Sequence, residues 1–196
     1  MVMDTYPTVL FLHFVSLFIG FGAAALMGTC LFRLRAAVTG ADAAPWGMLA
    51  GKTERAFPVA ILGLFATGAY MTSDVWTWDT GWIDVAIVAL VVLAATGILV
   101  ASRRAGLLES ALRASGAGPL SAEARKLTCD PALWIVTFGN PGLVLGVVWN
   151  MTQKPGTLEA IVAALIGYAV GSAVALQFAK APAAFAELHS ATEPRS

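Results

Sequence analysis

The sequence predicts an all-α membrane protein, a polytopic helix bundle in which residues 1–196 form a single transmembrane domain. Three observations support this fold class. Hydrophobic residues make up 58% of the chain and charged residues only 12%, and the mean hydropathy of +0.77 lies outside the range of soluble domains. About five stretches are apolar enough to cross a bilayer. The basic residues gather on one side of those stretches, as membrane proteins require.

The apolar stretches have the length of membrane-crossing helices, which need about 20 residues to span roughly 30 Å of hydrocarbon. No Lys or Arg precedes the first stretch, so we interpret it as a permanent helix and not as a cleaved signal peptide. Pro58 suits the first turn of the second stretch, and Thr157 offers an N-cap to the fifth. The predicted helices cover residues 8–34, 56–71, 82–101, 131–151 and 158–179.

The fourth stretch contains a helix breaker near its middle, Gly139-Asn140-Pro141-Gly142. Proline removes one backbone hydrogen bond and clashes with the preceding turn. We therefore predict that this helix is kinked or broken, with a re-entrant hairpin as the alternative. Freed backbone groups at membrane depth need protein or water as partners, so this segment is expected to face the bundle and not lipid.

The positions of the basic residues predict the orientation of the chain in the membrane. With five crossings, only Lys154 of the twelve Lys and Arg residues falls on one side. Loops rich in Lys and Arg stay in the cytoplasm, so we expect the N-terminus outside and the C-terminus in the cytoplasm, in a bacterial inner (plasma) membrane. The other basic residues are Arg33, Arg35, Lys52 and Arg55 in the first loop, Arg103, Arg104, Arg113, Arg125 and Lys126 in the third, and Lys180 and Arg195 in the tail.

The loop between the third and fourth stretches carries a helical pattern of its own. It contains Leu107, Leu108 and Leu112, followed by Gly116-Ala117-Gly118-Pro119. We predict an amphipathic extension of the third helix that lies on the membrane surface and ends at this glycine- and proline-containing breaker.

Small residues recur at every fourth position in two of the predicted helices. Such stripes allow helix backbones to approach closely, because lipid gives apolar side chains no reason to associate. We interpret both stripes as packing faces, whose partner is either another helix of this chain or a second copy. They consist of Ser16, Gly20, Ala24 and Gly28 in the first helix and of Ala163, Gly167, Gly171 and Ala175 in the fifth.

His13 is the one histidine inside a predicted membrane helix, close to its outer boundary. Ionisable groups at membrane depth are costly and often functional, and a neutral imidazole can ligate haem iron or copper. No second histidine lies in a predicted membrane helix to complete a paired haem site. We therefore predict that the ring points into the bundle and forms a hydrogen bond to a neighbouring helix, with a haem as the alternative partner.

Polar residues within the predicted helices are the candidates for a ligand cavity. They are Asn140 and Asn150 in the fourth helix and Thr67 in the second. Groups of this kind either line a cavity for a polar ligand or connect neighbouring helices by hydrogen bonds, and we favour the second interpretation. Cys30 and Cys129 occur without a CxxC or Cys/His cluster, so we expect free thiols and no metal site.

A few short motifs resemble a known group of proteins. They are His13 behind Phe11-Leu12, Arg33 at the end of the first helix, Gly81-Trp82-Ile83 at the start of the third, and the stretch from Asn150 to Gly156. In these motifs the chain resembles an uncharacterised bacterial family of predicted integral membrane proteins, which is distantly similar to the copper-resistance D-type and membrane-bound protoporphyrinogen oxidase four-helix domains. The oxidases carry a lysine shortly after the tryptophan that opens their third helix. This chain has none at the positions that follow Trp82, so the resemblance implies no oxidase activity.

Motifs for catalysis or nucleotide binding are missing, since the chain lacks HExxH, GxSxG and a phosphate-binding glycine loop. We therefore favour a non-catalytic protein with a structural, assembly or small-ligand-binding role in the membrane. One alternative is a haem-binding redox or haem-pathway protein that uses His13, and another is a small-solute transporter that uses the break at Pro141. The expected partners are the lipid bilayer and either further copies or other membrane subunits. The net charge of zero argues against nucleic acid.

Overall fold

The computed structural model describes residues 5–179, which form α-helices joined by short connections and no β-strand. The all-α fold class is confirmed. Lys180 and Arg195, which the predicted orientation also counts, lie outside the described residues. The elements in chain order are α1 (Thr5–Ala36), α2 (Gly40–Glu54), α3 (Ala56–Val75), α4 (Gly81–Thr96), the π-helical turn η1 (Gly97–Ala101), α5 (Ser102–Ser115), α6 (Ala122–Thr128), α7 (Pro131–Gln153) and α8 (Thr157–Ala179).

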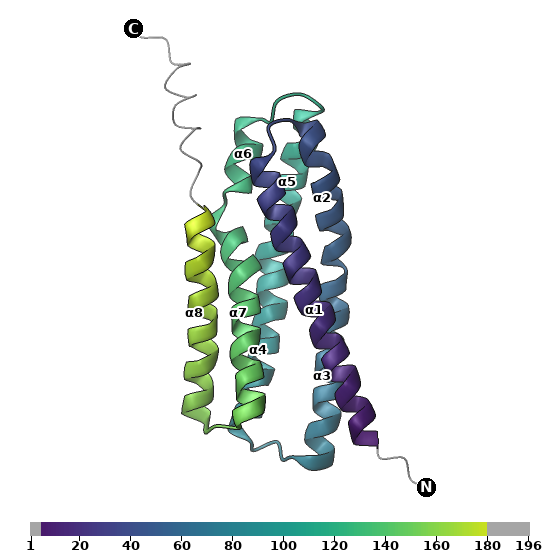
Figure 1. The fold of residues 1–196 in the computed structure, drawn as a ribbon, viewed down its shortest axis with the longest axis vertical. Helices are drawn as coiled ribbons and strands as arrows, with labels where there is room; N and C mark the ends of the chain where they lie inside the picture. Colours follow the sequence, from purple (N-terminus) through teal and green to yellow (C-terminus); the bar gives the residue numbers. More distant parts are fainter. Residues whose placement is uncertain (1–4, 180–196) are drawn as a thin grey trace.

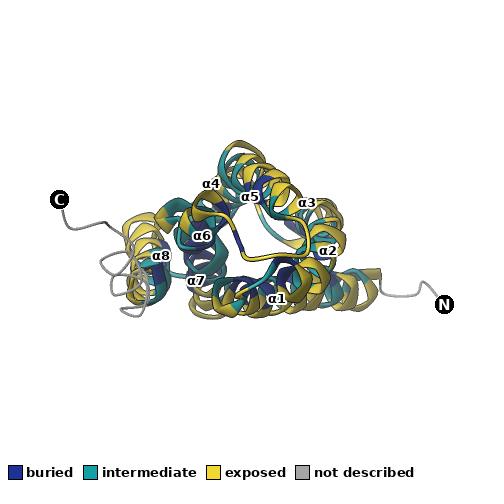
Figure 2. Ribbon diagram, turned by 90° about the horizontal axis from the view of Figure 1, so that it is seen from above, coloured by how far each residue is buried: buried dark blue, intermediate teal, exposed yellow. Residues whose placement is uncertain are grey.

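Within residues 5–179, five helical segments are long and apolar enough to cross a membrane. Viewed along its long axis, the molecule carries exposed residues around its outside (Figure 2). Many of these are large apolar side chains, a surface that water would not tolerate but that lipid can surround. The chain is therefore a multi-pass membrane protein. The five segments are Thr5–Ala36, Gly40–Val75, Gly81–Ser115, Ala122–Gln153 and Thr157–Ala179.

Several helices are longer than a bilayer is thick. α1 has 32 residues, which makes it about 48 Å long at 1.5 Å per residue, against roughly 30 Å of hydrocarbon. The end of α1 lies near α2, α5 and α6, at the end of the bundle opposite to the start of α1 (Figure 1). We call this the basic end, because Arg33 and Arg35 close α1 there, and Arg125 and Lys126 close α6.

The segment between the first and second predicted helices, which we interpreted from the sequence as a loop, is helical. A capping box begins α2: the Thr39 hydroxyl accepts from the backbone N–H of Asp42 at 3.1 Å, and the Asp42 carboxylate accepts from the backbone N–H of Thr39 at 3.2 Å. The box satisfies two backbone donors reciprocally. α2 passes directly into α3 at Arg55, so the second helical segment is longer than the predicted residues 56–71.

The third membrane helix continues past its predicted end. α4 passes through η1 into α5, and Gly116 ends the helix with a φ of +59°. The helical extension and its glycine breaker are therefore confirmed. Its predicted position on the membrane surface is wrong, because α5 continues α4 along the long axis of the bundle (Figure 1). There α5 buries Leu108 and Ala111 in a core shared with Ala43 of α2 and Ala124 of α6.

The fourth membrane helix is not broken at Pro141. α7 is one continuous α-helix with Pro141 inside it, so neither the broken helix nor the re-entrant hairpin forms. The cost of the proline is local, because its missing N–H deprives a single backbone carbonyl, that of Thr137, of its helical partner. Neighbouring helices and side chains compensate for such losses in membrane helices. Here α8 packs closely against this part of α7, and Asn140 bonds to α4.

The contact between α7 and α8 is close because both helices present glycine. A Cβ added to Gly142 would collide with the carbonyl oxygen of Gly167, and one added to Gly146 would lie 2.6 Å from the carbonyl oxygen of Ala163. Backbones this close leave no room for a side chain between them. The stripe on α8 therefore packs against another helix of this chain.

The stripe on α1 has two partners within the chain. A Cβ added to Gly63 of α3 would collide with the side chain of Ser16, whereas one added to Gly20 would lie 3.5 Å from the Cβ of Ala60, an ordinary contact. Gly28 faces α7. The contact between α1 and α3 is therefore looser at Gly20 than the contact between α7 and α8.

Candidate functional site

His13 is buried between α1 and α3, with only 6% of its surface exposed. Its Nδ1 lies 2.8 Å from the hydroxyl oxygen of Thr67. The Thr67 hydroxyl donates its one proton to the backbone carbonyl of Gly63 at 2.5 Å, so it accepts from His13, which carries its proton on Nδ1. The predicted interhelical hydrogen bond is confirmed.

A cavity of about 40 Å³ lies beside His13. This volume holds a few water molecules, whereas sites for small molecules and cofactors measure about 300–1,000 Å³. The cavity does not fit a porphyrin, so the alternative haem site at His13 is not formed in this structure. Its other lining residues are Leu17, Leu64, Ala86, Ala89, Leu90, Leu93, Val144, Val147, Val148 and Met151.

Asn140 connects α7 to α4. Its side-chain N–H donates to the hydroxyl oxygen of Thr96 at 2.9 Å, and that hydroxyl donates to the backbone carbonyl of Val92 at 2.8 Å. The bond lies next to Pro141 on α7 and next to η1 on the other helix. The transporter alternative depended on a break at this place, and α7 has none.

Asn150 connects α7 to α8 and is fully buried. Its side-chain N–H donates to the backbone carbonyl of Ala160 at 3.0 Å, while its Oδ1 has no hydrogen-bond partner among the described residues. Together with the bonds of His13 and Asn140, this contact supports the favoured interpretation of the membrane polar residues. They lie at three separate helix contacts, and the structure does not gather them into one site.

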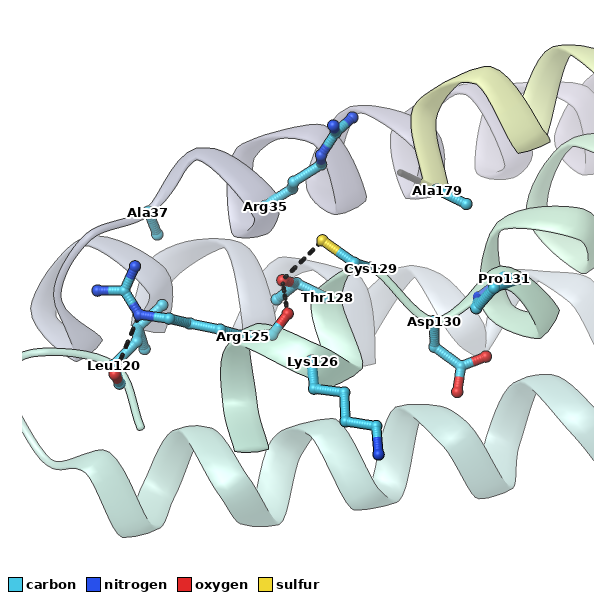
Figure 3. Close-up of a pocket in the computed structure, with 10 residues that line it drawn as sticks. All are labelled: Arg35, Ala37, Leu120, Arg125, Lys126, Thr128, Cys129, Asp130, Pro131 and Ala179. Atoms are coloured by element: carbon cyan, nitrogen blue, oxygen red, sulfur yellow. Dashed lines mark hydrogen bonds between the residues drawn. The ribbon is translucent and has the colours of Figure 1, made fainter. Parts of the chain in front are cut away.

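A pocket of about 400 Å³ lies at the basic end, where α6 meets α7. This volume is within the range of small-molecule sites. Figure 3 shows that the residues around it come from the end of α1 and the position after it, from the loop and helix α6 that precede α7, from the start of α7 and from the end of α8. The lining residues are Arg35, Ala37, Leu120, Arg125, Lys126, Thr128, Cys129, Asp130, Pro131 and Ala179.

Hydrogen bonds from two residues hold the junction of α6 and α7 that forms this pocket. The Asp130 carboxylate caps α7 by accepting from the backbone N–H of Ala132 at 2.8 Å, and it forms an ion pair with Arg104 of α5. The fully buried Trp134 donates its indole N–H to the backbone carbonyl of Thr128 at 2.8 Å. The fold itself therefore positions the pocket walls.

The charges around the pocket are mainly positive. Asp130 is the one acid among the described lining residues, and its carboxylate points away from Arg35 (Figure 3). The guanidinium of Arg35 lies 5.7 Å from the ring centroid of Trp134, a cation–π contact. Arg125 donates to two backbone carbonyls of neighbouring loops, at 3.2 and 3.4 Å. Both arginine side chains therefore line the pocket, with their guanidinium groups pointing in different directions (Figure 3), and Asp130 has an ion-pair partner in Arg104.

Sequence reasoning missed this pocket. It used Arg35, Arg125 and Lys126 only to predict orientation, because nothing in the sequence shows that the end of α1 meets α6. The available signal was local: two basic residues at the end of a short helix, followed by Asp130-Pro131, a strong helix start.

No protein-family model, curated protein or solved structure matches this chain. The resemblance to a bacterial family of membrane proteins therefore stays a prediction. Among residues 5–179, no group of three or more His, Cys, Asp and Glu side chains could hold a metal ion, and both cysteines are free.

Proposed function

We propose that this chain is a bacterial inner-membrane protein that binds a small ligand in the pocket at its basic end. The observation that carries the proposal is the pocket of about 400 Å³, which has the volume of a small-molecule site and is lined by two arginines. The polar residues within the membrane have a structural role, because His13, Asn140 and Asn150 each hydrogen-bond to a neighbouring helix.

In this proposal the basic end faces the cytoplasm and the start of α1 faces outward. The concentration of Lys and Arg at the basic end supports this orientation. Lys154 lies at the opposite end, where its ammonium is 4.7 Å from the ring centroid of Trp76. A ligand therefore reaches the pocket from the cytoplasm or from the inner leaflet.

Native mass spectrometry of the full-length protein, released gently from membranes, tests ligand binding. We expect the wild type to retain a bound mass and Cys129→Trp to lose it, because the indole would occupy the pocket. Ser110→Trp is the matched control, since Ser110 is exposed on α5 and does not line the pocket. The melting temperature of each variant shows whether it is folded. Equal retention by all three proteins, or no bound mass on the wild type, would contradict the proposal.

A further inference from the structure

His13 has one ring nitrogen that its bond to Thr67 does not use. Nδ1 carries the proton and donates it to the Thr67 hydroxyl, so Nε2 presents a lone pair. No described residue donates a hydrogen bond to Nε2, although only 6% of the His13 surface is exposed. A buried acceptor without a partner is destabilising, and water commonly satisfies such groups. His13 therefore offers one hydrogen-bond acceptor to a molecule in the space beside it.

The cavity beside His13 is otherwise lined by apolar side chains. It lies between α1 and α3 on one side and α4 and α7 on the other, and its volume of about 40 Å³ holds a few water molecules. His13 is the one polar residue among the described lining residues. A buried water molecule needs two or more polar partners, so a single water at Nε2 would have too few. Water in this cavity must therefore connect, molecule to molecule, to the solvent.

The route to the solvent leads to the end of the bundle opposite to the basic end. We call this the far end, where α7 ends at Gln153 and α4 begins at Gly81. Met151 lines the cavity two residues before the end of α7, and Ala86 lines it five residues after the start of α4. At 1.5 Å per residue, both positions are within about 8 Å of the helix ends. The connections from α3 to α4 and from α7 to α8 lie at this end (Figure 1).

Three side chains meet at the far end of this route. The ammonium of Lys154 lies 4.7 Å from the ring centroid of Trp76, and the Trp76 ring packs edge-on against Trp82 at 5.4 Å between centroids. Trp82 lies one turn before Ala86 on α4, and Lys154 follows Met151 by three residues. Trp76 therefore joins the ends of α3, α4 and α7 next to the cavity lining.

We infer that the cavity is the inner part of an inlet for water and small neutral solutes, which runs from the far end to Nε2 of His13 and is narrowed by Trp76. The apolar walls exclude ions, whereas a neutral molecule that donates one hydrogen bond finds its acceptor at Nε2. This inference goes beyond the proposed function, which concerns the pocket at the basic end.

Diethyl pyrocarbonate, a small neutral reagent that attacks an unprotonated imidazole nitrogen, measures access to Nε2. Full-length protein in a mild detergent is treated near neutral pH, and mass spectrometry of peptides gives the rate of His13 modification, with free N-acetylhistidine as the reference. We expect the wild type to react measurably but far more slowly than the reference. Lys154→Gln should raise the rate about two- to fivefold, the factor that corresponds to one exposed cation–π contact. Trp76→Ala should raise it about tenfold, because both ring contacts are lost.

Matched controls separate the inlet from a general loosening of the fold. Trp78→Ala removes an exposed tryptophan of the same connection that has no ring contact among the described residues, and should leave the rate unchanged. Ala86→Leu narrows the inlet from inside and should slow the reaction severalfold, both alone and combined with Trp76→Ala. Ala66→Leu is its control, at an exposed position of α3 outside the lining. The melting temperature of each variant shows whether it is folded.

Acceleration by Trp76→Ala that Ala86→Leu reverses supports the inlet. Equal rates in the wild type, Trp76→Ala and Ala86→Leu would show that the reagent reaches His13 by another route and would overturn the inference. It also fails if Ala86→Leu does not reverse the acceleration, or if His13 is unreactive in the wild type and in Trp76→Ala alike. None of these results depends on a bound mass at the basic end, so the proposed function is tested separately.

Discussion

Replacing Gly167 of α8 by alanine measures how much the close contact with α7 contributes to stability. The added Cβ would collide with the carbonyl oxygen of Gly142 and would lie 3.2 Å from the backbone nitrogen of Gly146. Because both atoms belong to the backbone of another helix, no side-chain rotation relieves the clash, and the helices must move apart. Overpacking of this kind costs about 1–3 kcal/mol, and we expect Gly167→Ala at the upper end of that range.

Gly22→Ala is the matched control on α1. No atom lies within 4 Å of a Cβ added to Gly22, and alanine is favoured over glycine in a helix by about 0.5–1 kcal/mol. This variant should therefore be as stable as the wild type or slightly more stable. Gly20→Ala should also lose nothing, because its added Cβ would meet that of Ala60 at an ordinary 3.5 Å. Only a larger residue, as in Gly20→Leu, is expected to separate α1 from α3.

Unfolding in mixed micelles of a mild detergent and increasing SDS, followed by tryptophan fluorescence, gives the differences in unfolding free energy. The expected result is a clear loss for Gly167→Ala and no loss for Gly22→Ala or Gly20→Ala. Equal stability of Gly167→Ala and Gly22→Ala would refute the close approach of α7 and α8.

Three further predictions follow from other parts of the molecule. His13→Ala should lower the unfolding free energy by about 1 kcal/mol, the contribution of its hydrogen bond to Thr67, and should change no visible absorption; a haem spectrum that disappears with His13 would contradict our account of this residue. Cys129 should react with an impermeant thiol reagent only after cells are permeabilised, and reaction in intact cells would reverse the proposed orientation. Thr39→Ala should cost about 1 kcal/mol in the SDS assay, because it removes the side chain that caps α2; no change would show that α2 does not depend on its cap.

The polar residues within the membrane show how far sequence reasoning reaches. A polar group in hydrocarbon needs a partner, so hydrogen bonds from His13 and Asn140 to other helices were predictable. Their partners, Thr67 and Thr96, were not, because both lie on helices whose positions relative to α1 and α7 the sequence does not show. The sequence does not show which helices are neighbours. For this reason the small-residue stripes could be identified, but the helices that pack against them could not.

Two local errors have different physical reasons. Pro141 predicted a kinked or broken helix, but no break forms, because the loss of one backbone hydrogen bond is small beside the close packing of α8 against α7 from Gly139 to Gly146. The helix α2 was missed because low hydropathy between two apolar stretches was interpreted as a loop. Its capping box at Thr39 and Asp42 was a readable signal for a helix start.

The sequence by itself determined that the chain crosses the membrane several times as helices. A segment that crosses hydrocarbon must be long and apolar and must satisfy its own backbone hydrogen bonds, and such segments can be recognised directly in the sequence. The tertiary structure alone decided that the close contact joins α7 to α8 and that Arg35, Arg125 and Cys129 meet around one pocket. Hydropathy is a property of consecutive residues, whereas a pocket forms between helices far apart in the chain, whose positions depend on how side chains of both fit at each contact.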